Sequence, residues 1–199
     1  ALKEAQQVRF TDEAETWKSL AIIGVYEALA QQQTAQQHHK HRCMFVVASV
    51  QLSNYGNEEK QLQQARVLIA SIERIRTQLL QARENVVHVL VCGNFNTLPG
   101  SAVYNFLMAN ASSSPALTVH TLPLGSVYFA ATGGREPPFT TVAGQWEGCT
   151  DYMFYSHSEL GLKDVTDVPP RDVLVGGVPN KDYSSNHLSL AASFTFATQ

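Results

Sequence analysis

The feature that most constrains the fold of this chain is a set of three nearly continuous apolar runs. One long helical pattern lies between the last two runs. The runs cover residues 20–29 (LAIIGVYEAL), 43–52 (CMFVVASVQL) and 86–92 (VVHVLVC). Short apolar runs rich in β-branched residues are typical of strands buried on both faces. Within residues 58–83 the apolar positions recur at three- and four-residue steps, which predicts an amphipathic helix. This order of strands and helix predicts a layered α/β fold.

The remaining elements are shorter. A helix is predicted over residues 101–109, with Ser101 as its N-cap, and strands over residues 149–155 and 187–196. Residues 111–138 and 173–180 are rich in Gly, Pro and Ser and are predicted as loops. Residues 31–42 (QQQTAQQHHKHR) form a polar, low-complexity segment predicted as an exposed loop. Its His38, His39 and His41 could bind a metal, but a solvated loop is favoured because no Cys or carboxylate accompanies them.

The composition limits the classes of protein to consider. The chain has 199 residues, 44% of them apolar, which suits one domain spanning residues 1–199. The net charge of −3 excludes nucleic-acid binding by a general basic field. No apolar run is long enough to span a membrane, and residues 1–10 lack the pattern of a signal peptide. Three scattered cysteines, Cys43, Cys92 and Cys149, indicate a reducing, intracellular setting, cytoplasmic or mitochondrial.

Polar clusters follow or begin three of the predicted strands. They are residues 93–96 (GNFN), 150–152 (TDY) and 185–187 (SNH). Strand ends are where α/β folds place reactive groups. Each cluster also has a plainer interpretation, since GNFN can be only a turn, Asp151 a loop cap and His187 a structural histidine.

Four segments, in order, resemble motifs of one superfamily. VLVCGNFNTLPGSAVYNFL resembles GDFNSxPxSxxYxFL, and PPFTTVAGQWEGCTDYMFYS resembles PxFTNYTxxFxGxLDYIFYS. GGVPNKDYSSNHLSLAASF resembles GLPNxxxSSDHLPLLAxF, and FVVASVQL with the following helix resembles VANTHL and its helix. The chain is thereby identified as similar to the endonuclease/exonuclease/phosphatase superfamily. The nearest branch is that of the Ccr-type deadenylases, nocturnin and the Angel proteins.

This resemblance implies an α/β fold in which a two-sheet β-sandwich is flanked by helices. It implies that the chain corresponds to the C-terminal half of that domain, with the N-terminal half missing. The earlier half supplies the first sheet, the metal-binding glutamate and an asparagine, and none of these has a counterpart here. We therefore expect a longer protein, or another chain, to supply them.

The family's site residues are only partly retained. Asn96, Asp151 and His187 match the motifs, whereas Asn94 and Asn186 stand where the family has Asp. Gln51 replaces a His, and Thr141 replaces an Asn. The resemblance implies a vestigial catalytic site made of Asn94, Asn96, Asp151 and His187, with Gln51, Thr141 and Asn186 beside it. Natural degeneration explains all four replacements better than engineering does, because trapping a substrate would not need Gln51 or Thr141.

These replacements guide the functional prediction. The family activates water beside Mg²⁺, which needs anionic oxygen ligands, and an amide cannot serve as one or act as a base. We expect no cofactor unless the chain is active, in which case Mg²⁺ is required. The prediction is a catalytically inactive, deadenylase-like domain, structural or RNA-contacting, that joins other protein subunits and no membrane. The alternatives are a Mg²⁺-dependent 3′-exoribonuclease acting on poly(A), or a related phosphodiesterase, and a bare protein-interaction module.

Overall fold

A computed structural model describes residues 1–10, 19–28, 42–54, 56–82, 85–109, 120–174 and 176–196. The predicted loop over residues 31–42, with His38, His39 and His41, lies outside these residues except for Arg42. Among the described residues, no helix is long and apolar enough to cross a membrane.

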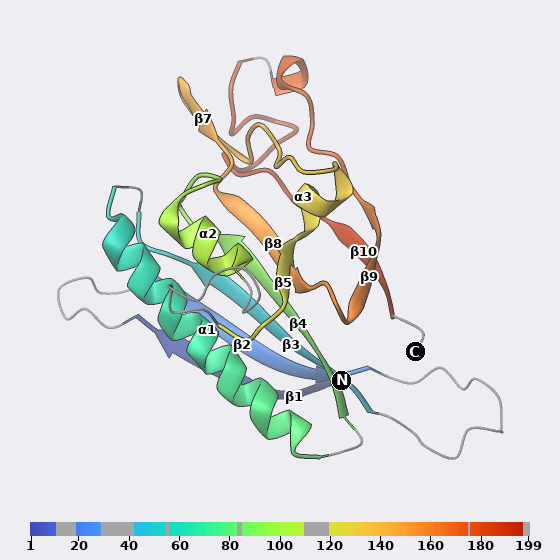
Figure 1. The fold of residues 1–199 in the computed structure, drawn as a ribbon. Helices are drawn as coiled ribbons and strands as arrows, with labels where there is room; N and C mark the ends of the chain where they lie inside the picture. Colours follow the sequence, from blue (N-terminus) through green and yellow to red (C-terminus); the bar gives the residue numbers. More distant parts are fainter. Residues whose placement is uncertain are drawn as a thin grey trace.

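A six-stranded sheet forms the centre of the fold (Figure 1). Its order is β1-β2-β3-β4-β8-β5, and only β3 and β4 are parallel. The strands are β1 (Leu2–Arg9), β2 (Leu20–Glu27), β3 (Arg42–Gln51), β4 (Asn85–Asn94), β8 (Asp151–Ser156) and β5 (Leu124–Ser126). The parallel pair requires a crossover, and helix α1 (Glu58–Leu80) supplies it.

Helices α1 and α2 (Ala102–Met108) cover one face of this sheet, as Figure 1 shows. Asn57 caps α1 by accepting a hydrogen bond from the Lys60 N–H, and Ser101 caps α2 in the same way through the Tyr104 N–H. The main core lies between these helices and the buried side chains of β2, β3, β4 and β8. Burial of this single face explains why alternate residues of β3 are buried.

The opposite face of the sheet is covered only in part. Helix α3 (Val127–Ala131) and a two-stranded sheet of β9 (Leu160–Val165) and β10 (Ala192–Phe196) pack there against β4 and β8. At the other end of this face, Ile22 and Tyr26 of β2 are 51% and 40% exposed. A strip of apolar surface on β2 therefore lies open beyond the cover that β9 and β10 provide.

A small third cluster organises the end of the molecule that carries β6 (Thr141–Ala143), β7 (Trp146–Gly148) and the 3₁₀ turn at Arg171–Leu174. Its buried residues are Phe139, Val142, Leu174 and Leu188. This cluster packs the segment that contains His187 against the β6–β7 hairpin.

The predicted strands and helices are confirmed within a few residues, and Ser101 is the N-cap of α2 as predicted. Three predictions are corrected. Residues 1–10, for which the sequence predicts no element, form β1 (Leu2–Arg9), an edge strand that is exposed along most of its length and buries Val8. The predicted loop over residues 111–138 is wrong in part, because β5 and α3 lie within it. The last strand begins at Ala192 rather than at His187, because residues 186–188 pair with β6 instead.

Candidate functional site

Three strand ends meet at one edge of the sheet. Gln51 lies opposite Asn94 in the parallel β3–β4 pair, and Asn94 lies opposite Asp151 in the antiparallel β4–β8 pair. The C-terminal ends of β3 and β4 therefore stand beside the start of β8. This register places three of the predicted site residues in one row across the sheet.

The turn after β4 depends on Gly93. Its φ is +143°, and an added Cβ would lie 2.0 Å from the Val50 carbonyl oxygen. Beyond it, Asn94 Oδ1 accepts a hydrogen bond of 2.8 Å from the Asn96 N–H. Asn96 itself has a φ of +51°, a conformation that asparagine tolerates better than most residues. Asn94 thus stabilises the turn through its side-chain oxygen, the atom with which a residue at this position would bind a metal ion.

Asn96 is anchored on both sides. Its Nδ2 donates to the Leu52 carbonyl at 2.8 Å, and its own carbonyl accepts from Gln61 Nε2 at 2.9 Å. Gln61 and Gln64 of α1 also bind Ser53, directly after β3. Neither glutamine is among the predicted site residues, although a polar residue on an otherwise buried helix face is a signal that the sequence does carry.

Asp151 and His187 form an ion-pair-type contact at the start of β8. His187 Nδ1 lies 3.0 Å from both carboxylate oxygens. Because a carboxylate accepts hydrogen bonds, this geometry assigns the proton to Nδ1 and leaves Nε2 as the second, functional ring nitrogen. The His187 side chain is 33% exposed and that of Asp151 is 15% exposed, so a solute can reach the histidine more easily than the carboxylate.

Backbone pairing holds His187 in place. The Val142 N–H donates to the Asn186 carbonyl, and the Leu188 N–H donates to the Thr140 carbonyl at 2.7 Å. His187 thereby forms an isolated bridge with Thr141. The segment before the last strand is therefore a second strand-like partner of β6, beside β7.

Three threonine hydroxyls surround the Asp151 carboxylate. Thr140, Thr141 and Thr150 each lie within hydrogen-bond distance of Oδ2, at 2.8, 2.8 and 3.2 Å. Thr141 also lies 2.9 Å from His187 Nδ1 and 2.6 Å from Thr150 Oγ1. Thr141 is a predicted site residue, whereas the sequence assigns no role to Thr140 or to the hydroxyl of Thr150. Thr140 matches the Thr of the FTNY motif and Thr150 directly precedes Asp151, and these positions are the signal that the sequence carries for them.

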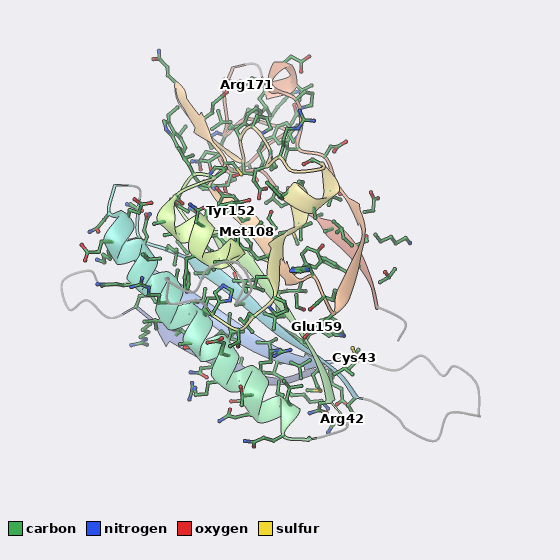
Figure 2. All side chains as sticks on the ribbon, viewed as in Figure 1. Arg42, Cys43, Met108, Tyr152, Glu159 and Arg171 are labelled. Carbon is green, nitrogen blue, oxygen red and sulfur yellow. The ribbon has the colours of Figure 1, made fainter. Side chains whose placement is uncertain are left out.

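The core beneath the site is rigidly hydrogen bonded. Tyr152, labelled in Figure 2, donates from its hydroxyl toward the carbonyls of Thr97 and Cys149, at 2.9 and 2.7 Å. Burial raises the pKa of the Tyr152 phenol, and it raises the pKa of the Cys149 thiol to about 12. Neither group is therefore suited to act as a base or nucleophile near neutral pH. A cavity of about 230 Å³ opens beside Asp151, lined by Cys92, Gly93, Asp151, Tyr152, Met153, Leu188 and Leu190.

The described residues do not fit a Mg²⁺ site. Mg²⁺ prefers octahedral oxygen ligands that include carboxylates. Here Asp151 is the carboxylate at the strand ends, and its Oδ2 already faces three hydroxyl groups and His187. Among the described residues, no group of three or more His, Cys, Asp or Glu side chains could hold a metal ion. These residues by themselves therefore support no catalytic step through Mg²⁺.

Comparisons with known proteins agree with this architecture. Residues 52–187 match the family described as "Endonuclease/Exonuclease/phosphatase family". "Carbon catabolite repressor protein 4 homolog 4" of Arabidopsis thaliana is 31% identical over 141 residues, which cover 67% of this chain and 33% of that protein. The human Nocturnin catalytic domain with bound sulfate superposes with a TM-score of 0.68 at 26% identity, covering 98% of this chain and 60% of that domain.

A second structure shows the fold alone. ANGEL2, described as a 2′,3′-cyclic phosphatase, superposes with a TM-score of 0.69 at 21% identity, covering 98% of this chain and 66% of that one. The resemblance to the Ccr-type, nocturnin and Angel branch is thus confirmed, as is the fold class of sheets flanked by helices. The chain spans about a third or less of the curated relatives' length. One of them is named as the 3′–5′-exoribonuclease subunit Ccr4 of the CCR4-Not complex of Aspergillus fumigatus.

Proposed function

Because the chain belongs to the endonuclease/exonuclease/phosphatase family, we propose that it is a catalytically inactive, deadenylase-like domain with a structural or RNA-contacting role in a larger assembly. One observation carries the proposal. Asn94 stands where the family motif has an Asp, and its Oδ1 accepts a hydrogen bond from the Asn96 N–H of the same turn. Gln51 and Asn186 are also neutral, so little negative charge is available to bind Mg²⁺.

An exonuclease assay tests this proposal. The protein is incubated with labelled oligo(A) and either Mg²⁺ or Mn²⁺, beside the Ccr4 exoribonuclease as a positive control. We expect no shortening of the oligonucleotide. Shortening by the wild-type protein that disappears in a His187→Ala variant would overturn the proposal.

The second candidate is an active Mg²⁺-dependent 3′-exoribonuclease or a related phosphodiesterase. The Asp151–His187 pair favours it, because a carboxylate-oriented imidazole is suited to stabilise charge on a phosphate or to transfer a proton. Any missing carboxylate ligand would have to come from another part of the protein. The same assay on this chain joined to such a part distinguishes the two candidates, with Mg²⁺ required under the second one only.

Contact with RNA is supported by an exposed aromatic side chain near the site. Trp146 of β7 is 41% exposed, and β7 pairs with β6, which holds Thr141. Exposed aromatic rings stack on single-stranded bases. We expect a Trp146→Ala variant to bind oligo(A) more weakly, by about tenfold or more for one lost stacking contact. A Phe129→Ala variant is the matched control, because Phe129 is 38% exposed on α3.

We further propose that the assembly includes other protein subunits and is intracellular. The open strip on β2 and the chain's small share of its relatives' length support a protein partner or a further part of the same protein. Cys43, Cys92 and Cys149 are all free thiols, which is consistent with a reducing compartment.

A further inference from the structure

Thr140 occupies a different position in the hydroxyl cluster from its two neighbours. Its side chain is completely buried, and its hydroxyl forms hydrogen bonds with two backbone N–H groups and with the Asp151 carboxylate. The N–H groups of Thr150 and Asp151 approach it at 3.0 and 2.9 Å, and Asp151 Oδ2 lies at 2.8 Å. Both N–H groups are donors, so they occupy the two lone pairs of the hydroxyl oxygen. The single hydroxyl proton therefore points to the carboxylate.

This assignment makes Asp151 Oδ2 an acceptor of the Thr140 hydroxyl proton. By donating to Oδ2, Thr140 holds the carboxylate in the position where it accepts from His187 Nδ1, at 3.0 Å. Thr141 and Thr150 can exchange donor and acceptor roles between themselves, because their oxygens lie 2.6 Å apart and neither accepts two backbone N–H groups in the described contacts. Thr140 is thus the one hydroxyl of the three whose direction the backbone dictates.

We propose that Thr140 is the positioning residue of the Asp151–His187 pair. It joins the carboxylate to the backbone at the start of β8, and through the carboxylate it selects the Nδ1–H tautomer of His187. Nε2 is thereby kept as the acceptor nitrogen of the neutral ring. This role goes beyond the proposed function, because it concerns the geometry of the pair whether or not the protein turns over a substrate.

Nitrogen NMR of protein labelled with ¹⁵N-histidine tests the role directly. The His187 signals are identified by their loss in a His187→Gln variant. In the wild-type protein above pH 8, we expect one tautomer, with the proton on Nδ1. The Nε2–H tautomer in the wild-type protein would overturn the inference without any further variant.

Substitutions then separate positioning from simple support of the fold. Thr140→Ala and Thr140→Val remove the hydroxyl, and we expect His187 to become a mixture of tautomers in whichever variant folds. Thr140→Ser keeps the hydroxyl and is expected to restore the single tautomer. Thr150→Val removes the most distant of the three hydroxyls and is expected to leave the tautomer unchanged. A single Nδ1–H tautomer in a folded Thr140→Ala protein, or an equal change in Thr150→Val, would refute the role.

Discussion

Replacing Gly93 by Ala tests how the site is built into the sheet. Gly93 has a φ of +143°, and a Cβ at this position would lie 2.0 Å from the Val50 carbonyl oxygen and 2.8 Å from the Val50 nitrogen. A non-glycine residue in such a backbone region costs about 1–3 kcal/mol. Separating the β3 and β4 backbones to relieve the contact adds about 1–3 kcal/mol, as overpacking does. We expect a loss of about 2–6 kcal/mol in the free energy of unfolding.

Gly100 offers a matched control. Its φ is +82°, but nothing lies within 4 Å of the position that a Cβ would occupy, so Gly100→Ala carries the backbone cost without the contact. We expect this control to lose about 1–3 kcal/mol. Urea unfolding of both variants, followed by circular dichroism, gives the two free energies. Equal losses in the two variants would show that the approach of β3 to Gly93 does not constrain the turn, and the reasoning would fail.

Three other predictions concern pH and association. Burial lowers the pKa of His120 below its usual 6.5, because the buried ring favours the neutral form. The protein therefore keeps its full free energy of unfolding above pH 6.5 and loses part of it as the pH falls. In urea titrations at pH 5 and 7, we expect His120→Phe to lose less stability at the lower pH than the wild type does. Burial raises the pKa of Glu136 above 4.5, so the contribution of its neutral form to the free energy of unfolding is lost as the pH rises. Glu136→Gln can still accept a hydrogen bond from the Tyr104 hydroxyl. We expect this variant to be more stable than the wild type at pH 8 and not at pH 4. We expect the 199-residue chain alone to self-associate through the open strip on β2, as measured by sedimentation velocity. Ile22→Thr on this strip should reduce the association more than Val67→Thr on α1 does. A monodisperse, cooperatively unfolding wild-type monomer would contradict this prediction.

The parts of the fold that the sequence predicts well are those with one dominant physical cause. The apolar face of α1 and the buried runs of β2, β3 and β4 each leave a clear pattern, because the core lies against them. β1 and β9 leave little pattern, since most of their side chains are exposed or only half buried, with Val8 and Leu160 as the buried exceptions. Their pairing is set by neighbouring strands, and single-segment patterns do not report such long-range pairing.

The features of the site likewise divide into those that the sequence predicts and those that it does not. The order of the motifs, through the family resemblance, indicates that Asp151 and His187 belong to one site, and the structure places them in contact. Spacing alone cannot pair them, because 36 residues separate them and the contact depends on the bridge between residue 141 and residue 187. The role of Thr140 cannot be deduced from the sequence for a similar reason. Its role arises from two backbone N–H groups that approach it only after β6 and β8 come together.

Under the proposed function, residue 94 explains how such a site can lose its charge and keep its shape. The turn needs an oxygen at residue 94 that accepts from the Asn96 N–H, and the amide of Asn94 supplies this oxygen as well as a carboxylate would. The substitution therefore removes a negative charge at little structural cost. Thr140 and Asn96 are different, because their side chains also hold backbone groups of β8 and of the segment after β3. We expect substitutions that remove charge to be tolerated best at positions such as 94 and 186. They should be tolerated least at Asp151, whose carboxylate lies within hydrogen-bond distance of three hydroxyls and a histidine. On this proposal the fold that the chain shares with ANGEL2, at a TM-score of 0.69, does not report on activity.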